Sequence, residues 1–535
     1  MSKRTMSQRT LMHVAMAAGC ACWTSAYPLT AQDVAVDRTK PPVVPAAKPP
    51  TLPSPTIVSL QNGITVAVLE DHHVPLVSVR AVMYIPAALE PYDKIGLTEI
   101  VRQMLQEGTT SHTPEQLADA FAALGDTVSP FGFYSTTANL DQSLDLMAEQ
   151  LMHPAFPAAA LERLKTNTLE RLRQGQQDAE YLANRLFVNI IYGRDHSYAR
   201  EGAVHVEELT AITREDVADY YKQYFCPPNV MFVVAGDVTP DEATKKLERV
   251  FGTWALGNKA AASIQLPSGS ASATVYLFDR PHSPESVIMF GDVGLRWGSD
   301  AYPALLLNTV FGGTLSSRLE ANLRDEHHYT DSVGSHYILR AHPNGAPGGG
   351  GAQSQVAEAP SGGGTPSGGA PGGGAPSAAP QFHLPSAPPV GPQAGTFMIT
   401  MRVPTEKTDS AVNEVLNEMR DLRSERPPTP EELDFAKSAM TMHTTLQFET
   451  LEQRANEVAT LLKEEIPYWY YRDYKAVVNR FKVTPDKVEH ATKYIDPFAI
   501  GIIVVGDRSV LEPKFRAADI APVVLLDQTG GIGAN

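Results

Sequence analysis

The sequence predicts an α+β protein made of two duplicated sandwich domains, each a mainly antiparallel sheet with helices packed against it. Three observations support this fold class. The chain has 535 residues, which is too long for one ordinary hydrophobic core. Short apolar strands alternate with longer amphipathic helices along its length. One series of local features occurs twice.

The repeated series is a capped helix, a proline, an apolar strand and a Gly-Asp pair. In the first copy these are a helix from Ile212 to Tyr224, Pro227, a strand over 230–234 and Gly236-Asp237. In the second copy they are a helix from Val483 to Tyr494, Pro497, a strand over 500–505 and Gly506-Asp507. All the features keep their order about 270 positions apart, which indicates a duplicated domain.

The other helices and strands are predicted from the spacing of apolar residues and from residues that typically begin or end a helix. In the first copy we expect strands over 64–69 and 76–85 and helices over 156–174 and 179–191, with a further helix starting at Thr113-Pro114 and ending at Gly125. In the second copy we expect strands over 274–278, 286–290, 333–339 and 396–403 and helices over 301–311, 316–324, 408–423 and 430–446.

Composition changes along the chain predict the domain boundaries. We expect a signal peptide over 1–31, a disordered lead-in over 32–52, an N-terminal domain over 53–258, a linker over 259–273, a C-terminal domain over 274–515 and a tail over 516–535. Residues 343–394 are almost entirely Gly, Pro, Ala and Ser, so they cannot bury enough apolar surface to fold. They are predicted to form a disordered insert within the second domain.

The N-terminus predicts export to the periplasm or beyond. A basic start precedes a short apolar stretch over 11–23, which is too short to span a bilayer. Two alternatives are a lipoprotein, because Gly19-Cys20 follows an apolar run, and an ordinary buried helix. Cys226 is the only cysteine after residue 31, which excludes an internal disulfide and a cysteine zinc cluster from the mature chain.

Composition also limits the class of partner. Hydrophobic residues make up 43% and charged residues 19% of the chain, values typical of a soluble globular protein. The formal net charge is −16, and the sequence contains no lysine or arginine run suited to a nucleic-acid surface. We therefore expect no nucleic-acid partner.

The segment Gly96–Thr109 carries the most information about function. Its apolar residues at 97, 100, 101, 104 and 105 predict a helix with one buried stripe. The opposite stripe carries Glu99, Arg102, Gln103 and Gln106. A guanidinium stays protonated in proteins, so Arg102 cannot act as a general base, and we expect it to pair with Glu99 one turn away.

Across roughly residues 55–510 the chain resembles the pitrilysin/insulinase-type zinc metallopeptidase family. The motifs that carry the resemblance are Leu60–Ile64, Gly96–Thr109, Tyr192–Tyr198, Val234–Asp237, Phe311–Gly313, Ser316–Leu319 and Leu323-Arg324. The resemblance implies paired α+β domains that enclose a chamber and a zinc-dependent endopeptidase activity.

The active-site positions of that family are replaced in this chain. By resemblance, the two metal histidines fall at Glu99 and Gln103, the base at Arg102 and the third ligand, a glutamate, at Arg171 beside Glu170. An arginine that contacts substrate is kept as Arg324, whereas the tyrosine seven residues later is Asp331, with Tyr329 two residues away. A cation and an amide are poor zinc ligands, so we expect neither zinc nor another cofactor.

Three hypotheses follow. The leading one is a non-catalytic subunit that binds unfolded peptides and supports an active homologous peptidase in a heterodimer. The alternative is an active metalloendopeptidase with a non-standard metal site, in which Glu99, Glu170 and nearby carboxylates hold a hard cation. The third is a solitary peptide-binding or scaffold protein.

Other clusters are interpreted as structural. His327-His328 and His72-His73 are expected to lie in solvated polar turns, because adjacent residues point in different directions. The aromatic run Pro467–Tyr471 is expected to pack a helix against the sheet, with the lining of a peptide-binding chamber or a partner surface as its alternatives.

Overall fold

The computed structural model describes most of the two predicted domains. The described residues are 55–85, 89–193, 196, 199, 206–259, 269–295, 300–338, 395–446, 450–463, 485–528 and 530–532. The predicted signal peptide, lead-in and insert over 343–394, and the aromatic run Pro467–Tyr471, lie outside the described residues. No described helix is long and apolar enough to cross a membrane.

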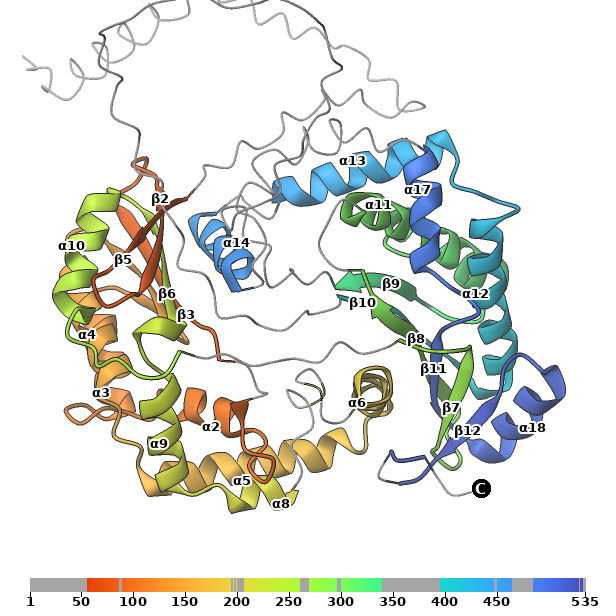
Figure 1. Cartoon of the computed structure of the whole chain (residues 1–535), viewed down its shortest axis with the longest axis horizontal. Coiled ribbons are helices and arrows are strands. Elements are labelled where there is room, and N and C mark those ends of the chain that lie inside the picture. The colour runs from red at the N-terminus through yellow and green to blue at the C-terminus, as the bar shows by residue number, and fades with distance from the viewer. Residues whose placement is uncertain are drawn as a thin grey trace, which may run out of the picture. The chain divides into compact units, whose positions relative to one another are not determined.

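The first domain is built on a six-stranded sheet. In spatial order the strands are β1 (Thr56–Ser59), β2 (Thr65–Glu70), β6 (Val230–Gly236), β3 (Leu76–Met83), β5 (Gly132–Thr136) and β4 (Thr127–Ser129). Only β2 and β6 run parallel, and the other neighbours are antiparallel. One face is covered by α2 (Leu97–Met104), α3 (Pro114–Ala123), α4 (Leu140–Met152), α5 (Ala158–Gly175), α8 (Val206–Ala211), α9 (Arg214–Tyr224) and α10 (Pro240–Phe251) (Figure 1).

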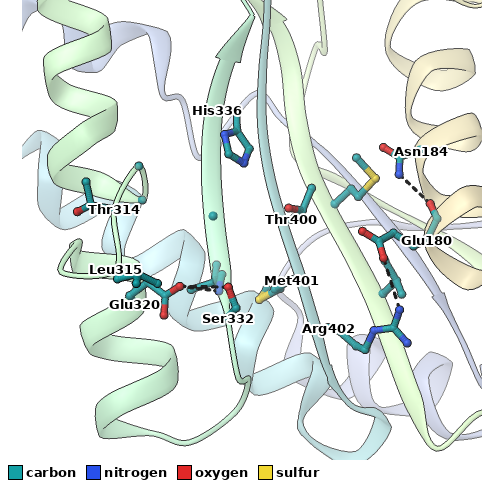
Figure 2. A pocket seen from close by; sticks show the side chains of 16 residues that line it. Glu180, Asn184, Thr314, Leu315, Glu320, Ser332, His336, Thr400, Met401 and Arg402 are labelled. Carbon is teal, nitrogen blue, oxygen red and sulfur yellow. Dashed lines mark hydrogen bonds and ion pairs between the residues drawn. The ribbon is translucent and has the colours of Figure 1, made fainter. Parts of the chain in front are cut away.

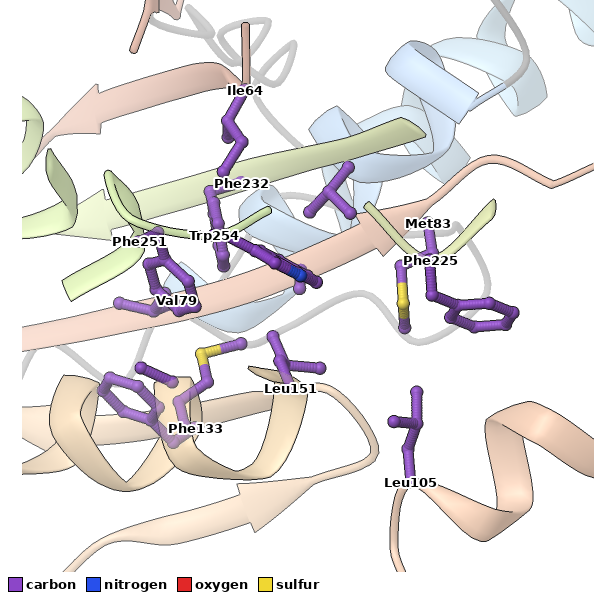
Figure 3. Close-up of a cluster of buried hydrophobic side chains, with 14 of the residues drawn as sticks. Ile64, Val79, Met83, Leu105, Phe133, Leu151, Phe225, Phe232, Phe251 and Trp254 are labelled. Atoms are coloured by element: carbon purple, nitrogen blue, oxygen red, sulfur yellow. The ribbon is translucent and has the colours of Figure 1, made fainter. Parts of the chain in front are cut away.

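The main core of the first domain lies between that sheet face and these helices (Figure 3). Aromatic side chains at its centre form a chain of contacts. The rings of Phe232 and Phe251 have centroids 4.6 Å apart, and those of Phe251 and Trp254 are 5.9 Å apart. These contacts join β6 to the end of α10, and burying such large apolar surfaces dominates the stability of the domain.

The second domain is built on a second six-stranded sheet. Its spatial order is β12 (Val523–Leu526), β7 (Thr274–Asp279), β11 (Gly501–Gly506), β8 (Glu285–Gly294), β10 (Gly395–Pro404) and β9 (Val333–Ile338). One face packs against α11 (Ala301–Phe311), α12 (Thr408–Arg423), α13 (Pro430–Leu446), α17 (Pro485–Ala491) and α18 (Arg508–Ala518). Short 3₁₀ turns occur at Pro227–Asn229, Thr405–Lys407 and Thr492–Tyr494.

The two sheets share one topology, which confirms the duplicated α+β fold. In the first sheet five strands taken in chain order (β2, β3, β4, β5, β6) are arranged as first, fifth, second, fourth, third. The strands β7 to β11 of the second sheet have the same arrangement, and in both sheets the first and fifth strands are parallel. The sixth strands differ, because β1 is antiparallel to β2 whereas β12 is parallel to β7.

Each domain contributes one helix to the other domain's sheet. Helix α6 (Ala179–Tyr192) comes from the first copy, but its buried side chains pack against β8 and β11 of the second sheet. Helix α14 (Leu451–Lys463) comes from the second copy and packs against β2, β3 and β6 of the first sheet. Small side chains, including Ala455 and Ala459, let α14 lie close to the strands.

The predicted helix starts at Thr113 and Thr213 are confirmed by the geometry of the helix ends, and Thr239, which was not predicted, has the same geometry. Thr113, Thr213 and Thr239 each accept a hydrogen bond from the backbone three residues on, and the side chain at that third position bonds back to the threonine amide. These reciprocal capping boxes satisfy N–H groups that have no partner inside the helix.

Two segments differ from expectation. The segment predicted as an α-helix over 316–324 instead contains a π-helix, Glu320–Glu326, with His327 donating to the carbonyl of Asn322 five residues earlier. Residues 516–535, expected to be a tail outside the domain, contain the last residues of α18 and strand β12. The apolar run Val523–Leu526 extends the second sheet beyond residue 515, because it pairs with β7.

Candidate functional site

Helix α2 is held at its N-terminus by a buried carboxylate. The helix starts after Gly96, whose φ of +97° is a left-handed conformation that favours glycine. Glu90 accepts hydrogen bonds from the amides of Gly96 and Thr98, each at 2.8 Å. A carboxylate at this end also complements the helix dipole, so Glu90 fixes the orientation of α2. Sequence analysis did not identify this residue, which lies outside the helix.

The predicted stripes of α2 are found in the structure. Leu97, Ile100, Val101, Met104 and Leu105 are all buried in the first core. On the opposite side, Gln103 Nε2 donates to Glu99 Oε1 at 2.7 Å, a contact between residues four apart on one helix face.

The expected pair between Arg102 and Glu99 is wrong. Arg102 is half-buried and its Nη2 donates to the carbonyl of Met83, the last residue of β3, at 3.1 Å. The carboxylate of Glu99 is taken by Gln103, since a residue four positions on reaches it along the same face. The guanidinium therefore faces the strand end, where it is a hydrogen-bond donor and has no capacity to accept a proton.

The predicted third ligand position lies on α5 and is exposed. Arg171 donates to Thr168 Oγ1 at 3.0 Å, and Glu170 pairs with Arg173 at 2.6 Å. Within the described ranges no hydrogen bond or ion pair joins either residue to Glu99 or Gln103. Among the described residues, Glu99 and Glu170 belong to no group of three or more His, Cys, Asp or Glu side chains that could hold a metal ion.

The residues present do not fit a zinc ion. Two of the family's four site positions carry guanidinium groups, and the amide of Gln103 is engaged as a donor. Among the described residues, no group of three or more His, Cys, Asp or Glu side chains is arranged to hold a metal. Zinc needs neutral imidazoles, thiolates or carboxylates at close range, so no metal-dependent step is derived for this helix.

In the second domain Arg324 lies on the π-helix and is engaged within the chain. Its Nη1 lies 2.8 Å from Glu320 Oε2, its Nε donates to Asp325 Oδ1 at 2.8 Å and its Nη2 donates to the Leu315 carbonyl at 3.2 Å. Glu320 is only 2% exposed and also accepts from the amide of Val333. Arg324 thereby ties the loop before the π-helix to the start of β9, and its role toward substrate stays a prediction.

The residues near the expected tyrosine position point in separate directions. Asp331 is exposed, and the ring of Tyr329 stacks on His327 with centroids 5.0 Å apart. His328 Nδ1 is 2.8 Å from the carbonyl oxygen of Arg324. The two histidines therefore have different neighbours, as expected for a polar turn rather than a chelating pair.

His72 and His73 also contact different residues. His72 lies 2.7 Å from both Asp237 Oδ1 and Glu70 Oε1, whereas His73 contacts Asp71. Asp71 also binds Arg454 of α14 at 2.7 Å. This exposed cluster therefore connects the end of β2 with the Gly-Asp pair of β6 and with the helix contributed by the second copy.

We predict that His72 titrates above its usual range. Hydrogen bonds with Asp237 and then Glu70 raise its pKa from 6.5. The stabilisation from protonated His72 is therefore complete below pH 6.5 and is lost as the pH rises through the folded-state pKa. An NMR titration of the His72 ring should show the raised pKa, and Asp237→Asn should lower it. An unchanged midpoint in the variant would contradict this assignment.

A pocket opens on the face of the second sheet that α6 covers only in part. Its volume is about 480 Å³. It lies between α6, strands β8, β10 and β9, and the loop Gly312–Leu315. Figure 2 shows Glu320 and Ser332 joined at one end and Arg402 paired with Glu180 of α6 at the other. Its lining includes His336, Thr400 and the main chain of Gly312 and Gly313.

The Gly-Gly pair at this pocket is required by close packing. A Cβ at Gly312 would lie 2.5 Å from Ser335 Oγ, and one at Gly313 would lie 2.9 Å from the Cα of Thr309. The sequence motif Phe311–Gly313 indicated a special segment but not a pocket. The pocket residues come from α6, β9 and β10, which are far apart in the chain, so sequence reasoning did not group them.

Comparisons with known proteins agree with the fold. The model of the family described as "Peptidase M16 inactive domain" matches residues 211–345. An uncharacterized zinc protease of Bacillus subtilis, YmxG, is 23% identical over 286 residues, covering 52% of this chain and 68% of that protein. A protein of Helicobacter pylori named "Non-peptidase homolog YmxG" is 22% identical over 288 residues, covering 49% of this chain and 62% of that protein.

Solved structures show the same fold. A peptidase M16 inactive domain from Pseudomonas fluorescens has a TM-score of 0.66 at 19% identity, covering 85% of this chain and 98% of that one. The periplasmic protease PqqL of Escherichia coli has a TM-score of 0.61 at 13% identity, covering 88% of this chain and 49% of that one. These findings confirm the resemblance of the chain to pitrilysin/insulinase-type peptidases in sequence and fold, and the family model that matches residues 211–345 is that of the inactive domain.

Proposed function

We propose that this protein is a non-catalytic, exported subunit that binds unfolded peptides and supports an active peptidase of the same fold. The single observation that carries the proposal is the state of α2, where Arg102 donates to a strand-end carbonyl at the position of the general base. Peptide hydrolysis by a zinc-activated water needs a proton acceptor there, and a permanent cation supplies none.

The pocket on the second sheet supports a role in peptide binding. A volume of about 480 Å³ accommodates one or two side chains of an extended peptide. The side chain of Leu315 is 72% exposed at its rim, and Thr400 and Gly334 leave the sheet surface hollow. In this proposal Leu315 packs against an apolar side chain of the peptide at the rim of the pocket.

Binding at this pocket does not depend on adding a strand to β9. The first half of the outer edge of β9 is already occupied: the amide of Val333 donates to Glu320, the amide of Ser335 donates to the Gly312 carbonyl, and the Ser335 carbonyl accepts from Asn308. An incoming peptide strand would have to break these bonds. Recognition is therefore assigned to side chains in the pocket and to the loop Gly312–Leu315.

The partner in this proposal is a homologous peptidase that keeps both metal histidines and the glutamate base. The two chains would form a heterodimer that shares a chamber, with this subunit holding peptides that its partner cleaves. Export to the periplasm is proposed from the predicted signal peptide over 1–31, and the fold neighbour PqqL is described as periplasmic. Co-purification with such a peptidase, and loss of its activity when this chain is deleted, would support the pairing; full activity without this chain would refute it.

A matched pair of leucines tests the peptide pocket. Leu315→Glu should weaken binding of a fluorescein-labelled unfolded peptide at least about tenfold, because a carboxylate replaces the apolar rim and adds charge near Glu320. Leu256 is 70% exposed and does not line the pocket, so Leu256→Glu serves as the control and should leave affinity unchanged. Fluorescence anisotropy measures both. Equal affinities for the two variants would remove the pocket from the proposal.

A further inference from the structure

A larger cavity lies apart from the peptide pocket, where α5, α6 and the turn after β7 meet. Its volume is about 1050 Å³. One side is formed by the end of α5 and the start of α6, and the other by residues 278–281 together with Gln528 and Gly530 near the C-terminus. Helices of the first copy and a strand end of the second therefore share this cavity.

Two arginines of this cavity have N–H groups without a hydrogen-bond partner among the described residues. Arg185 of α6 is half-buried, and within the described ranges it makes no hydrogen bond or ion pair. Arg280 donates one N–H to the carbonyl of Gln177 and interacts electrostatically with the Asp178 carboxylate, but no carboxylate lies at ion-pair distance from it among those residues. A guanidinium that is half-buried beside a cavity can direct its N–H groups to an anion bound there.

The acidic residues that line the cavity form no ion pair with these arginines in the described part of the chain. Asp279 Oδ1 accepts the backbone amide of Arg508 at 3.1 Å, at the start of α18. Glu207 lies exposed in the first turn of α8 and pairs with neither arginine. Among the described residues, the N–H groups of Arg185 and the remaining N–H groups of Arg280 have no hydrogen-bond partner and can donate to a bound anion.

The remainder of the lining combines apolar side chains with three glutamines, Gln176, Gln177 and Gln528. Leu172, Leu182, Leu186 and Phe278 contribute side chains from α5, α6 and β7, and Val206 lies at the start of α8. Leu186 and Phe278 are buried in the cluster where α6 packs on the second sheet. The cavity thus combines an apolar wall with two guanidinium groups, the combination that suits a ligand with an apolar chain and an anionic end.

We propose that this cavity binds an amphiphilic carboxylate, either a fatty acid or the C-terminus of a peptide that ends in an apolar residue. Guanidinium groups bind carboxylates with two parallel N–H···O bonds. They therefore bind a planar carboxylate more tightly than a group that offers one acceptor oxygen. The apolar chain would lie against Leu172, Leu182 and Phe278. Because the site is separate from the pocket at Leu315, it does not depend on the proposed peptide-binding function.

Calorimetry with four small probes tests the site in the full chain. Decanoate and a hexapeptide acid ending in leucine carry the carboxylate, whereas decanol and the same hexapeptide as its amide do not. We expect at least one acid to bind at least tenfold more tightly than its uncharged counterpart, and the tighter acid identifies the source of the ligand. Equal binding of acid and uncharged probe, or no binding of either acid at millimolar concentration, would overturn the proposal.

Substitutions of the lining residues test whether the acid binds in this cavity. Arg185→Gln should weaken the preferred acid at least tenfold while leaving the thermal transition unchanged, since Arg185 makes no described contact. Leu172→Trp should weaken it by filling the apolar wall. Arg249→Gln removes an arginine whose side chain is 47% exposed on α10 and should have no effect. Undiminished affinity in Arg185→Gln would place the ligand elsewhere and refute the site.

Discussion

Replacing Gly236 by alanine should destabilise the first domain by about 4 kcal/mol or more, one of the largest losses a single methyl group can cause. Gly236 closes β6 with a φ of +127°, a conformation that side chains rarely adopt. A Cβ there would lie 2.0 Å from the carbonyl oxygen of Leu76. That oxygen cannot move away freely, because it accepts the amide of Asp237 at 2.9 Å.

Gly63→Ala provides the matched control. Gly63 also has positive φ, +89°, but a Cβ added there would meet no atom of a non-adjacent residue within 4 Å. The cost should therefore be only that of the left-handed backbone, about 1–2 kcal/mol. Soluble yield and thermal unfolding by circular dichroism compare the variants. A loss in Gly236→Ala no larger than in Gly63→Ala would show that the Gly-Asp corner is not the steric constraint described here.

Replacing Phe187 by alanine should cost about 3–5 kcal/mol. Phe187 lies on α6, is 1% exposed and packs into the second sheet. Its ring rests directly on β8, since a Cβ at Gly291 would lie 2.5 Å from it. Removing the ring leaves a cavity between α6, which belongs to the first copy, and the sheet of the second copy. Because both domains form this interface, repacking within one domain cannot fill the cavity.

A substitution on the exposed face of the same helix serves as the control for Phe187→Ala. Asn184 is exposed and its side chain bonds only to the carbonyl of Glu180 in the described structure, so Asn184→Ala should change stability by no more than about 0.5 kcal/mol. Chemical denaturation followed by circular dichroism measures both variants. Equal stability of Phe187→Ala and the parent would contradict the exchange of helices between the domains.

The duplicated fold was predictable because its signals are local. The apolar spacing in α2 follows from the helical period, and the Gly-Asp pairs mark corners where the main chain passes close to a neighbouring strand. Both features depend on residues near one another in the chain. The apolar spacing and the Gly-Asp pairs are therefore visible in the sequence, and they identify the two copies without knowledge of the tertiary structure.

The exchange of α6 and α14 could not be predicted in the same way. An amphipathic helix shows that one face is buried but not which sheet covers it. The π-helix at Glu320–Glu326 has no distinct sequence period either. For the candidate site, position-by-position resemblance located Arg102, but its contact with the Met83 carbonyl depends on how α2 meets the end of β3. Pocket residues such as Glu180 and Arg402 meet only in the folded chain.

The most direct test of this account is metal analysis of the purified protein together with a peptide-cleavage assay with and without chelator. Because Arg102 and Gln103 act as donors where a base and a ligand would be needed, the account predicts far less than one zinc per chain and no chelator-sensitive cleavage. A pitrilysin-type peptidase with both histidines, assayed in parallel, shows that the conditions support activity. One zinc per chain with turnover that the chelator abolishes would contradict the account.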